Sequence, residues 1–161
     1  MARKRKDKKS TAPEGARILL RNKRAYYDYD ISERIEAGIA LVGSEVKSLR
    51  DQRGSLGEGY VDIRDGQAWL VGATINEYPW ANQFNHEPKR DRRLLLHRRE
   101  IAKLGIKTHQ RGFTLVPLSI YLKQGKIKLE IGVARGKRQY EKRESVKAAD
   151  ARREVDRAMK R

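Results

Sequence analysis

The sequence of 161 residues has no cysteine, only four prolines and few aromatic residues. Without cysteine the chain can form neither a disulfide nor a thiolate metal site, and it has no thiol nucleophile. This absence fits a reducing cytoplasm. No apolar run reaches the roughly 18 residues that a membrane-spanning helix needs. No apolar segment follows the basic start of the chain either, so we expect no secretory signal.

Motifs of common catalytic chemistries are also missing. The phosphate-binding loop G-x-x-x-x-G-K-[ST] and the nucleophile motif G-x-S-x-G do not occur. His97 and Glu100 lie three residues apart and could share a helical face, but two ligands beside Arg98 and Arg99 do not make a cation site. We therefore expect no enzyme, no cofactor and no bound metal.

Positive charge, in contrast, is abundant. The chain has 38 Lys and Arg against 21 Asp and Glu, a net charge of +17. Residues 1–17 have seven Lys/Arg against two acids, and residues 135–161 have eleven against five. Clusters of Lys and Arg bind polyanions by releasing condensed counterions. Nucleic acid is therefore the favoured partner, and an anionic membrane surface is the alternative. For residues 1–10, a simple solubility role is an equal alternative.

Residue patterns predict a mainly β fold between two disordered basic tails. Residues 1–17 form the first tail, residues 18–134 the domain and residues 135–161 the second tail. Alternation of apolar and polar residues predicts extended strands over residues 25–43, including Tyr27, with a bulge or bend at Gly38. The dipeptides Asp65-Gly66 and Gln124-Gly125 predict two hairpins.

Helical spacing predicts two helices within the domain. The first starts with Ser44 as N-cap and stops at Gly54. The second covers residues 93–105, with Leu94 and Leu95 packed on the domain and Gly105 as C-cap. Residues 78–93 are predicted to be a loop. Short antiparallel strands with flanking helices are typical of a small β-barrel of the oligonucleotide-binding type.

The C-terminal segment 135–161 has few large apolar residues and cannot form a core alone. From Ala148 onward, small and apolar residues recur at 148, 151, 155, 158 and 159, which is helical spacing. An isolated helix with such a narrow apolar stripe is marginal in water. We expect it to become ordered against a partner, with Tyr140 available to stack on a base.

Five segments in this order resemble the family of SsrA-binding proteins, also called small protein B. They are RNKRAYYDY, IEAGIALVGSEVKSLR, NHEPKRDRRLLLHRREI, GFTLVPLSIYL and IGVARGKRQYEKR. The resemblance covers about residues 18–161. It implies an OB-like antiparallel β-barrel with flanking helices, a cytoplasmic location and no catalysis. It also implies a monomer that binds the tRNA-like domain of tmRNA in a 1:1 complex and replaces the missing anticodon arm.

The family's role is to rescue stalled ribosomes by trans-translation, in which the incomplete peptide is tagged for degradation. The resemblance implies a tail that is disordered in solution and helical in the empty mRNA channel near the decoding centre. The implied tmRNA contacts are Asn22, Lys23, Arg24, Glu36, Leu95, His97 and Lys128, with Arg90, Arg92 and Arg93 as weaker candidates. The implied ribosome contacts are Gly136, Lys137, Arg138, Tyr140, Lys142 and Arg143.

Several of these assignments have alternatives. An acid such as Glu36 on an RNA-facing surface could accept hydrogen bonds from unstacked bases, or it could form an ion pair with a neighbour such as Arg24 or Arg34. Spacing alone favours Leu95 as a core residue. Tyr26-Tyr27 stand where many relatives have a basic residue followed by His, so this contact would lose a positive charge while a ring remains to stack.

Two other functions compete with ribosome rescue. A structural ribosomal protein would also use basic tails on RNA, but it should stay bound to one subunit in high salt. A nuclease would need a cluster of carboxylates or histidines for a divalent metal, and the sequence offers no such cluster.

Overall fold

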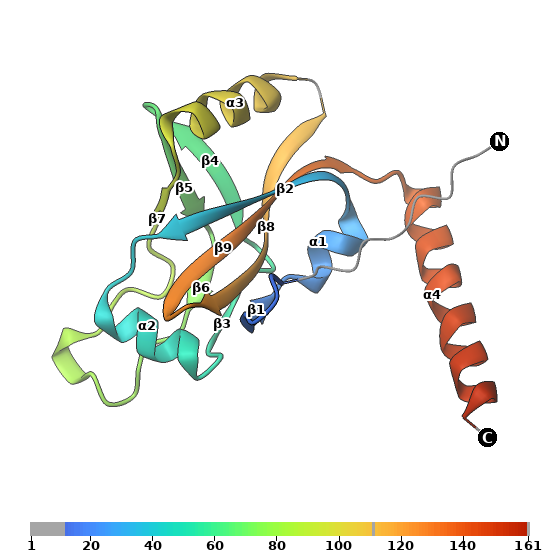
Figure 1. Cartoon of the computed structure of the whole chain (residues 1–161), viewed down its shortest axis with the longest axis horizontal. Helices are drawn as coiled ribbons and strands as arrows, with labels where there is room; N and C mark the ends of the chain where they lie inside the picture. Colours follow the sequence, from blue (N-terminus) through green and yellow to red (C-terminus); the bar gives the residue numbers. More distant parts are fainter. Residues whose placement is uncertain (1–11, 111, 161) are drawn as a thin grey trace.

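Antiparallel strands close into a ring in the computed structural model, which describes residues 12–110 and 112–160. The ring runs β8–β4–β5–β7–β2–β9, and β9 pairs again with β8 (Figure 1). Its strands are β2 (Tyr29–Ile39), β4 (Tyr60–Arg64), β5 (Gln67–Val71), β7 (Arg92–Leu95), β8 (Phe113–Lys123) and β9 (Lys126–Gly136). Outside the ring, β1 (Arg17–Arg21) pairs with β8, and β3 (Gly54–Ser55) pairs with β6 (Thr74–Ile75). The predicted small β-barrel is confirmed.

Both predicted hairpins are present. Asp65 and Gly66 have φ angles of 49° and 71°, and Gln124 and Gly125 have φ angles of 51° and 75°. Two consecutive residues with positive φ form the turn whose twist matches that of antiparallel strands. The turns join β4 to β5 and β8 to β9, and the long second hairpin supplies two of the six strands of the described ring.

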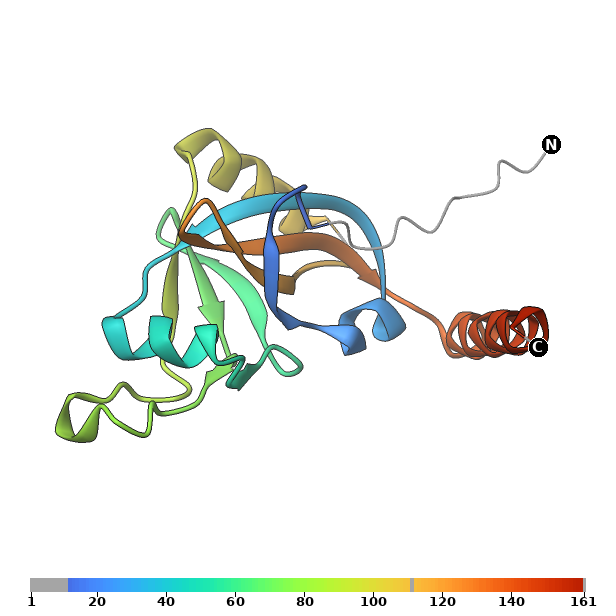
Figure 2. The ribbon, with the colours of Figure 1, turned by 60° about the horizontal axis from the view of Figure 1, so that its bottom comes forward.

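Helices lie around the barrel. They are α1 (Lys23–Asp28), α2 (Gly43–Arg50), α3 (Arg98–His109) and α4 (Gln139–Met159), with a short 3₁₀ turn η1 (Asn82–Phe84). Leu49 of α2 and Leu104 of α3 are fully buried in the main core together with Leu70, Leu115 and Leu129 of the strands. These two helices therefore close the barrel, whereas α4 projects away from it (Figures 1 and 2).

Two predictions around β2 were wrong. Residues 23–28, including Tyr27, are helical rather than extended, because Asn22 caps the helix by accepting a hydrogen bond from the Ala25 amide. The bulge lies between Ile31 and Glu33 rather than at Gly38. Gly38 instead permits close packing, since a Cβ there would lie 3.0 Å from the Leu95 Cβ.

The helix boundaries also differ from the prediction. Ser44 lies within the first turn of α2, which begins after Val42 and ends at Arg50, before Gly54. Leu94 and Leu95 belong to β7, and α3 begins only after His97 and continues through Gly105 to His109. A short apolar run has the same appearance in a buried strand and in a helix, so spacing alone misassigned this segment. The predicted loop over residues 78–93 is confirmed up to Asp91, with η1 inside it.

Within the C-terminal tail, residues Gln139–Met159 form the helix α4. The resemblance implied a tail that is disordered in solution and helical on the ribosome, and this change of state stays a prediction. None of the α4 residues, all within the described part of the chain, is buried. The helix begins with a hydrogen bond from the Arg138 amide to Glu141 Oε2, at 3.0 Å. The disorder predicted for residues 1–11 lies outside the described residues. Residues 12–16 lead through a turn into β1, which already includes Arg17.

Candidate nucleic-acid interface

Three of the predicted RNA contacts lie together on the outer surface of the barrel. Gly38 of β2 is paired with Leu95 of β7 and with Lys128 of β9. Glu36 lies two residues before Gly38 and therefore on the same face of β2. Leu95 is 54% exposed, so the structure places it on the surface rather than in the core. We call Glu36, Leu95 and Lys128 the outer face.

Two residues of β8 hold the side chain of Glu36. The Tyr121 hydroxyl donates a hydrogen bond to Glu36 Oε2, and Lys123 Nζ lies 3.4 Å from the same oxygen. Within the described residues no other contact engages the carboxylate, so Oε1 is left as an acceptor. The ion pair considered for Glu36 is thus present, with Lys123 as a partner.

The protonation states of this pair follow from the same contacts. The hydrogen bond from Tyr121 lowers the pKa of Glu36 against the opposing effect of desolvation, and the charges of Lys123 and Lys128 lower it further. Burial, followed by the hydrogen bond to Glu36, raises the pKa of Tyr121. Glu36 is therefore ionised at neutral pH, and the Tyr121 phenol remains a proton donor.

A second carboxylate lies beside Glu36. Glu130 of β9 is the register partner of Glu36 and receives hydrogen bonds from Ser119 Oγ at 3.0 Å and Arg34 Nη1 at 3.3 Å. These donors hold Glu130 in place and compensate its charge. Sequence reasoning missed Tyr121 and Glu130. The available signal was a tyrosine inside an apolar strand, since a buried hydroxyl needs a partner.

Asn22 differs from the predicted direct RNA contact. Its side chain is buried, with 4% exposure, and its Nδ2 donates to the carbonyl oxygens of Leu56 (3.2 Å) and Pro117 (2.8 Å). Since Oδ1 already caps α1, the polar atoms of this side chain are used within the protein. Asn22 therefore fastens α1 to the barrel. The exposed side chains of Lys23 and Arg24 are presented by α1, and Arg24 forms an ion pair with Asp28 at 3.3 Å.

The base of the tail is attached to α1. The Lys137 amide donates to the Asp28 carbonyl oxygen at 2.9 Å, and Lys137 Nζ donates to the Tyr26 carbonyl oxygen at 3.0 Å. Lys142 Nζ lies 3.3 Å from Asp28 Oδ1 and 5.8 Å from the centroid of the Tyr27 ring. Tyr27 is 46% exposed, so it presents a ring at the junction of α1 and α4.

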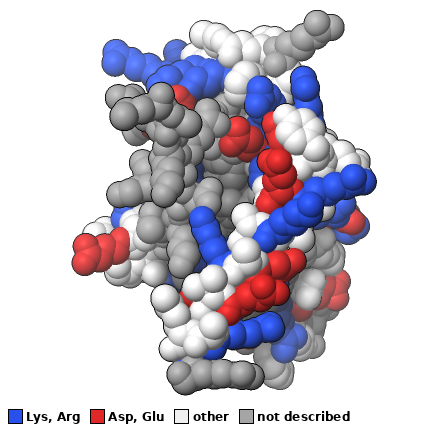
Figure 3. All heavy atoms as spheres, turned by 90° about the vertical axis from the view of Figure 1, so that its right-hand side faces the viewer, with Lys and Arg blue, Asp and Glu red and all other residues white. Residues whose placement is uncertain are grey.

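The other predicted ribosome contacts lie where β9 passes into α4. Gly136 ends β9 opposite Tyr29, and Arg138 is the N-cap residue of α4. Tyr140 is 57% exposed in the first turn of α4, and Arg143 is exposed one turn later. Figure 3 looks onto this side of the molecule, where Lys and Arg side chains project with Asp and Glu interspersed among them.

His97 lies two residues after Leu95 and is exposed at the start of α3. Its amide donates to Glu100 Oε2 at 3.1 Å, so Glu100 serves as a helix cap. In residues 12–110 and 112–160 no group of three or more His, Asp and Glu side chains could hold a metal ion.

Two of the weaker candidates are structural. Arg92 is fully buried and donates to Glu45 Oε1 at 3.1 Å and to the Pro88 carbonyl oxygen at 3.0 Å, so it cannot reach RNA. Arg90 Nη2 donates to Glu45 Oε2 at 2.9 Å. Burial raises the pKa of Glu45, but hydrogen bonds from Arg90 and the charge of Arg92 outweigh it and leave the pKa lowered. Arg93 is exposed and donates to Gln67 Oε1 at 3.0 Å.

Comparison with known proteins identifies the family. The family model described as "SmpB protein" matches residues 19–161. The chain belongs to the SmpB family. An SsrA-binding protein of Syntrophobacter fumaroxidans is 50% identical over 97% of this chain and 96% of its own length. Another, of Thermobifida fusca, is 48% identical over 100% and 99% of the two chains. The resemblance inferred from the five sequence segments is thus confirmed.

A solved structure of an SmpB-family chain has the same fold. It is described as "tmRNA-SmpB: a journey to the center of the bacterial ribosome". It is 42% identical to this chain, with a TM-score of 0.65, and covers 81% of this chain and 95% of its own. In residues 12–110 and 112–160 of the present protein, no helix is long and apolar enough to cross a membrane.

Proposed function

We propose that this protein binds tmRNA and acts with it on stalled ribosomes in trans-translation. The observation that carries the proposal is an ionised glutamate, Glu36, beside Leu95 and Lys128 on the outer face of the barrel. Its Oε2 is held by Tyr121 and Lys123, and no other described residue engages its Oε1. Membership of a family of SsrA-binding proteins supports it. The protein would work in the cytoplasm, where ribosomes are, and by binding rather than by catalysis.

The outer face suits a looped RNA better than a regular duplex. A carboxylate repels phosphates but accepts hydrogen bonds from the amino and imino groups of bases, which are accessible in unstacked loops. Leu95 offers an apolar surface to a base or ribose, and Lys128 offers a charge to a phosphate. We therefore propose that Glu36, Leu95, His97 and Lys128 contact a loop of the tRNA-like domain of tmRNA. Lys23 and Arg24 would add phosphate contacts from α1.

The tail would act on the ribosome rather than on tmRNA. Residues 135–161 have a net charge of +6, and within them α4 (Gln139–Met159) is a helix with no buried residue to pack on the barrel. A channel lined by ribosomal RNA phosphates provides partners for these cations and a base for Tyr140. We propose that α4 enters the empty mRNA channel beyond the decoding centre. Because an mRNA would occupy the same space, only a ribosome without mRNA there would admit the helix.

A stop codon in place of Gln139 tests this division of labour. The truncation keeps β9 and the contacts of Lys137 with α1, and it removes only α4. We expect nearly normal affinity for tmRNA and loss of peptide tagging in one reconstituted system. Glu36→Gln is the matched variant. In contrast to the truncation, it should weaken the binding of tmRNA itself. Normal tagging by the truncated chain would contradict the proposed role of α4, and loss of tmRNA affinity would place the tail in tmRNA binding.

A further inference from the structure

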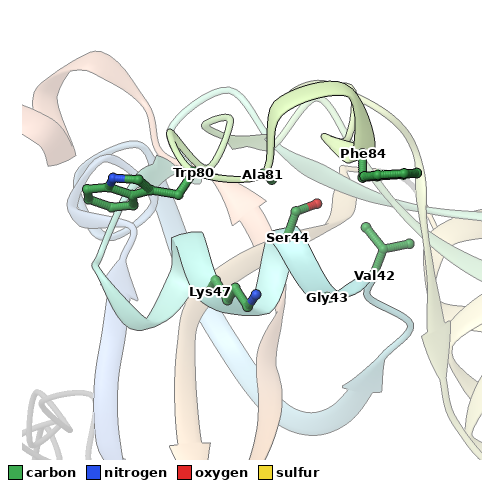
Figure 4. Close-up of a pocket in the computed structure, with 7 residues that line it drawn as sticks. All are labelled: Val42, Gly43, Ser44, Lys47, Trp80, Ala81 and Phe84. Carbon is green, nitrogen blue, oxygen red and sulfur yellow. The ribbon is translucent and has the colours of Figure 1, made fainter.

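A hollow of about 410 Å³ lies between α2 and the loop that contains η1. Val42, Gly43, Ser44 and Lys47 line it from the start of α2, and Trp80, Ala81 and Phe84 line it from the loop. Figure 4 shows Trp80 and Phe84 at opposite ends of the hollow. The hollow belongs to the end of the molecule opposite α4 (Figures 1 and 2), so it is separate from the tail.

The two aromatic rings of the hollow contribute little to the core. Trp80 is 69% exposed and Phe84 is 81% exposed. Trp80 contacts Tyr78 edge to face, with ring centroids 5.2 Å apart, and this contact leaves most of the indole uncovered. Exposing such apolar surface to water is unfavourable, and a local concentration of it marks an interaction site.

The loop is fastened to the body of the protein, so the hollow has a defined shape. The Asn85 side chain makes two hydrogen bonds with the Tyr78 backbone, at 3.0 and 2.8 Å. His86 is buried and bridges Ser44 Oγ and the Ile75 carbonyl oxygen, each at 2.8 Å. Because a carbonyl oxygen only accepts, His86 Nε2 donates to it, and Nδ1 forms a hydrogen bond with the Ser44 hydroxyl.

The charge of the hollow selects among possible partners. Lys47 is the one charged residue that lines it, and its Nζ lies 5.6 Å from the centroid of the Tyr78 ring. The neighbouring carboxylate, Glu45, is fully buried against Arg90 and Arg92 and does not line the hollow. The hollow therefore combines flat apolar rings with one cation, Lys47, which pairs with no carboxylate among the described residues. A nucleobase on a phosphate backbone has the complementary features.

We propose that this hollow binds an unstacked base of a single-stranded RNA segment. Trp80 or Phe84 provides the stacking surface, and Lys47 contacts the adjoining phosphate. This second RNA site goes beyond tmRNA recognition by the outer face, and it rests on the proposed function only in taking RNA as the partner. An apolar peptide would also pack on the rings, but it would offer no negative charge to Lys47.

The test measures how the full chain binds hexauridylate with a fluorescent label, by anisotropy. We expect Trp80→Ala combined with Phe84→Ala to weaken binding at least about fivefold, the lower end of one base stacked on an aromatic ring. A hexamer of equal charge with abasic sites should bind the unaltered chain as weakly as RNA binds the double variant. Lys47→Ala should reduce the slope of log affinity against log salt by about one phosphate contact.

A direct readout comes from Trp80 itself. The chain has two tryptophans, so Trp69→Phe leaves Trp80 as the sole reporter, and hexauridylate should quench its fluorescence. Because both exposed rings lie outside the core, the double variant should keep its melting temperature. Equal binding of hexauridylate by the double variant and the unaltered chain would overturn the proposal. It would also be overturned if the double substitution weakened binding of the abasic hexamer as much as binding of hexauridylate, because the rings would then not act on a base. A double variant that bound RNA normally but failed on ribosomes would assign the hollow to a protein partner.

The control separates this proposal from tmRNA recognition. Glu36→Gln alters the outer face, and the fold-loss of hexauridylate binding caused by Trp80→Ala with Phe84→Ala should be the same with Glu36 or Gln at that position. If the chain bound hexauridylate through the hollow but had no affinity for the tRNA-like domain of tmRNA, the proposed function would fail and the hollow would stand. If the chain bound the tRNA-like domain of tmRNA but did not bind hexauridylate in the hollow, only the inference about the hollow would be contradicted.

Discussion

At the scale of single residues, Glu36 is the most specific feature of the proposed tmRNA surface. Lys and Arg side chains can reach phosphates from many positions, so each of them is individually weak as an indicator. Glu36 has its Oε2 held by Tyr121 and Lys123, and its Oε1 is unengaged within the described residues. A fixed acceptor suits base donors, and its position depends on a residue on another strand.

We expect Glu36→Gln to weaken tmRNA binding by about 1–3 kcal/mol, because an amide replaces a charged acceptor for base donors. The measurement is equilibrium binding to the tRNA-like domain, with thermal melting to check the fold. Tyr121→Phe is the matched variant. It removes only the hydroxyl, so the pKa of Glu36 should rise toward its ordinary value in an NMR titration. If binding by Glu36→Gln fell only in step with unfolding, Glu36 would be a structural residue.

Glu45 should make stability depend on pH. Its pKa is lowered in the folded protein from the ordinary value of 4.5, so its contribution is fully present above that value and is lost as pH falls through the lowered one. Glu45→Gln would leave Arg92 buried without its counter-charge. At pH 7 we expect it to reduce the free energy of unfolding by about 3–5 kcal/mol. Urea unfolding at pH 7 and pH 3 checks this, and an equal difference at both would contradict it.

At the scale of elements, the sequence correctly predicted the two hairpin turns, which depend on local backbone preferences. The glycines of Asp65-Gly66 and Gln124-Gly125 adopt the positive φ that a two-residue hairpin turn requires, and each pair lies between two apolar runs. Helix starts were harder, because α2, α3 and α4 begin after Val42, His97 and Arg138, none of which is a typical cap residue. In each case a glutamate three residues later accepts the hydrogen bond from the cap amide, and this half of the capping box gave the only signal.

The candidate site was predictable only in part, for a physical reason. Asn22 was named as an RNA contact from the resemblance. Its structural role was not visible in the sequence, because its partners, the carbonyls of Leu56 and Pro117, are 34 and 95 positions away. The hydrogen bond from Tyr121 to Glu36 spans 85 positions. No local pattern records such pairings. The resemblance named Glu36, Leu95 and Lys128, which the fold brings together on one face, and their contact with RNA stays a prediction.

We expect α4 to fold independently of the barrel core beyond its first turn, which Lys142 holds to Asp28. It has no buried residue, and helix propensity and contacts such as the ion pair of Arg153 with Asp150 support it. Ala151→Gly should destabilise the helix by about 1 kcal/mol, because glycine loses more backbone freedom. Circular dichroism of the full chain should show less helix and an unchanged melting temperature of the barrel. A lowered barrel transition would mean that α4 packs on the body.

At the scale of the whole molecule, charge and recognition are separated in space. The net charge of +17 is concentrated in the two terminal segments, and the 117 residues between them contribute +6. The outer face proposed to bind tmRNA even contains a carboxylate, Glu36, with the buried Glu130 as its register partner. Attraction to RNA in general and recognition of one RNA therefore rest on different parts of the chain.

The salt dependence of tmRNA binding should consequently be less steep than the net charge suggests. Each neutralised phosphate adds roughly −0.7 to −0.9 to the slope of log affinity against log salt. Removing residues 1–10 and 139–161 should leave this slope and most of the affinity for the isolated tRNA-like domain unchanged. The measurement is binding across a salt series for both chains. A truncated chain that lost nearly all specific binding would show that the tails recognise the RNA.

The attachment of α4 to α1 has a consequence for the geometry of the tail. Because Lys137 and Lys142 hold the start of the helix to Asp28, its direction is set by the barrel. A rigid helix advances about 1.5 Å and turns about 100° with every residue. One residue added or removed just inside the start of α4 would therefore keep its charge but redirect all the later side chains. The positive charge of the tail attracts it to RNA. The rotation of α4 about its axis, which its attachment to the barrel sets, determines which of its side chains face which groups of the RNA.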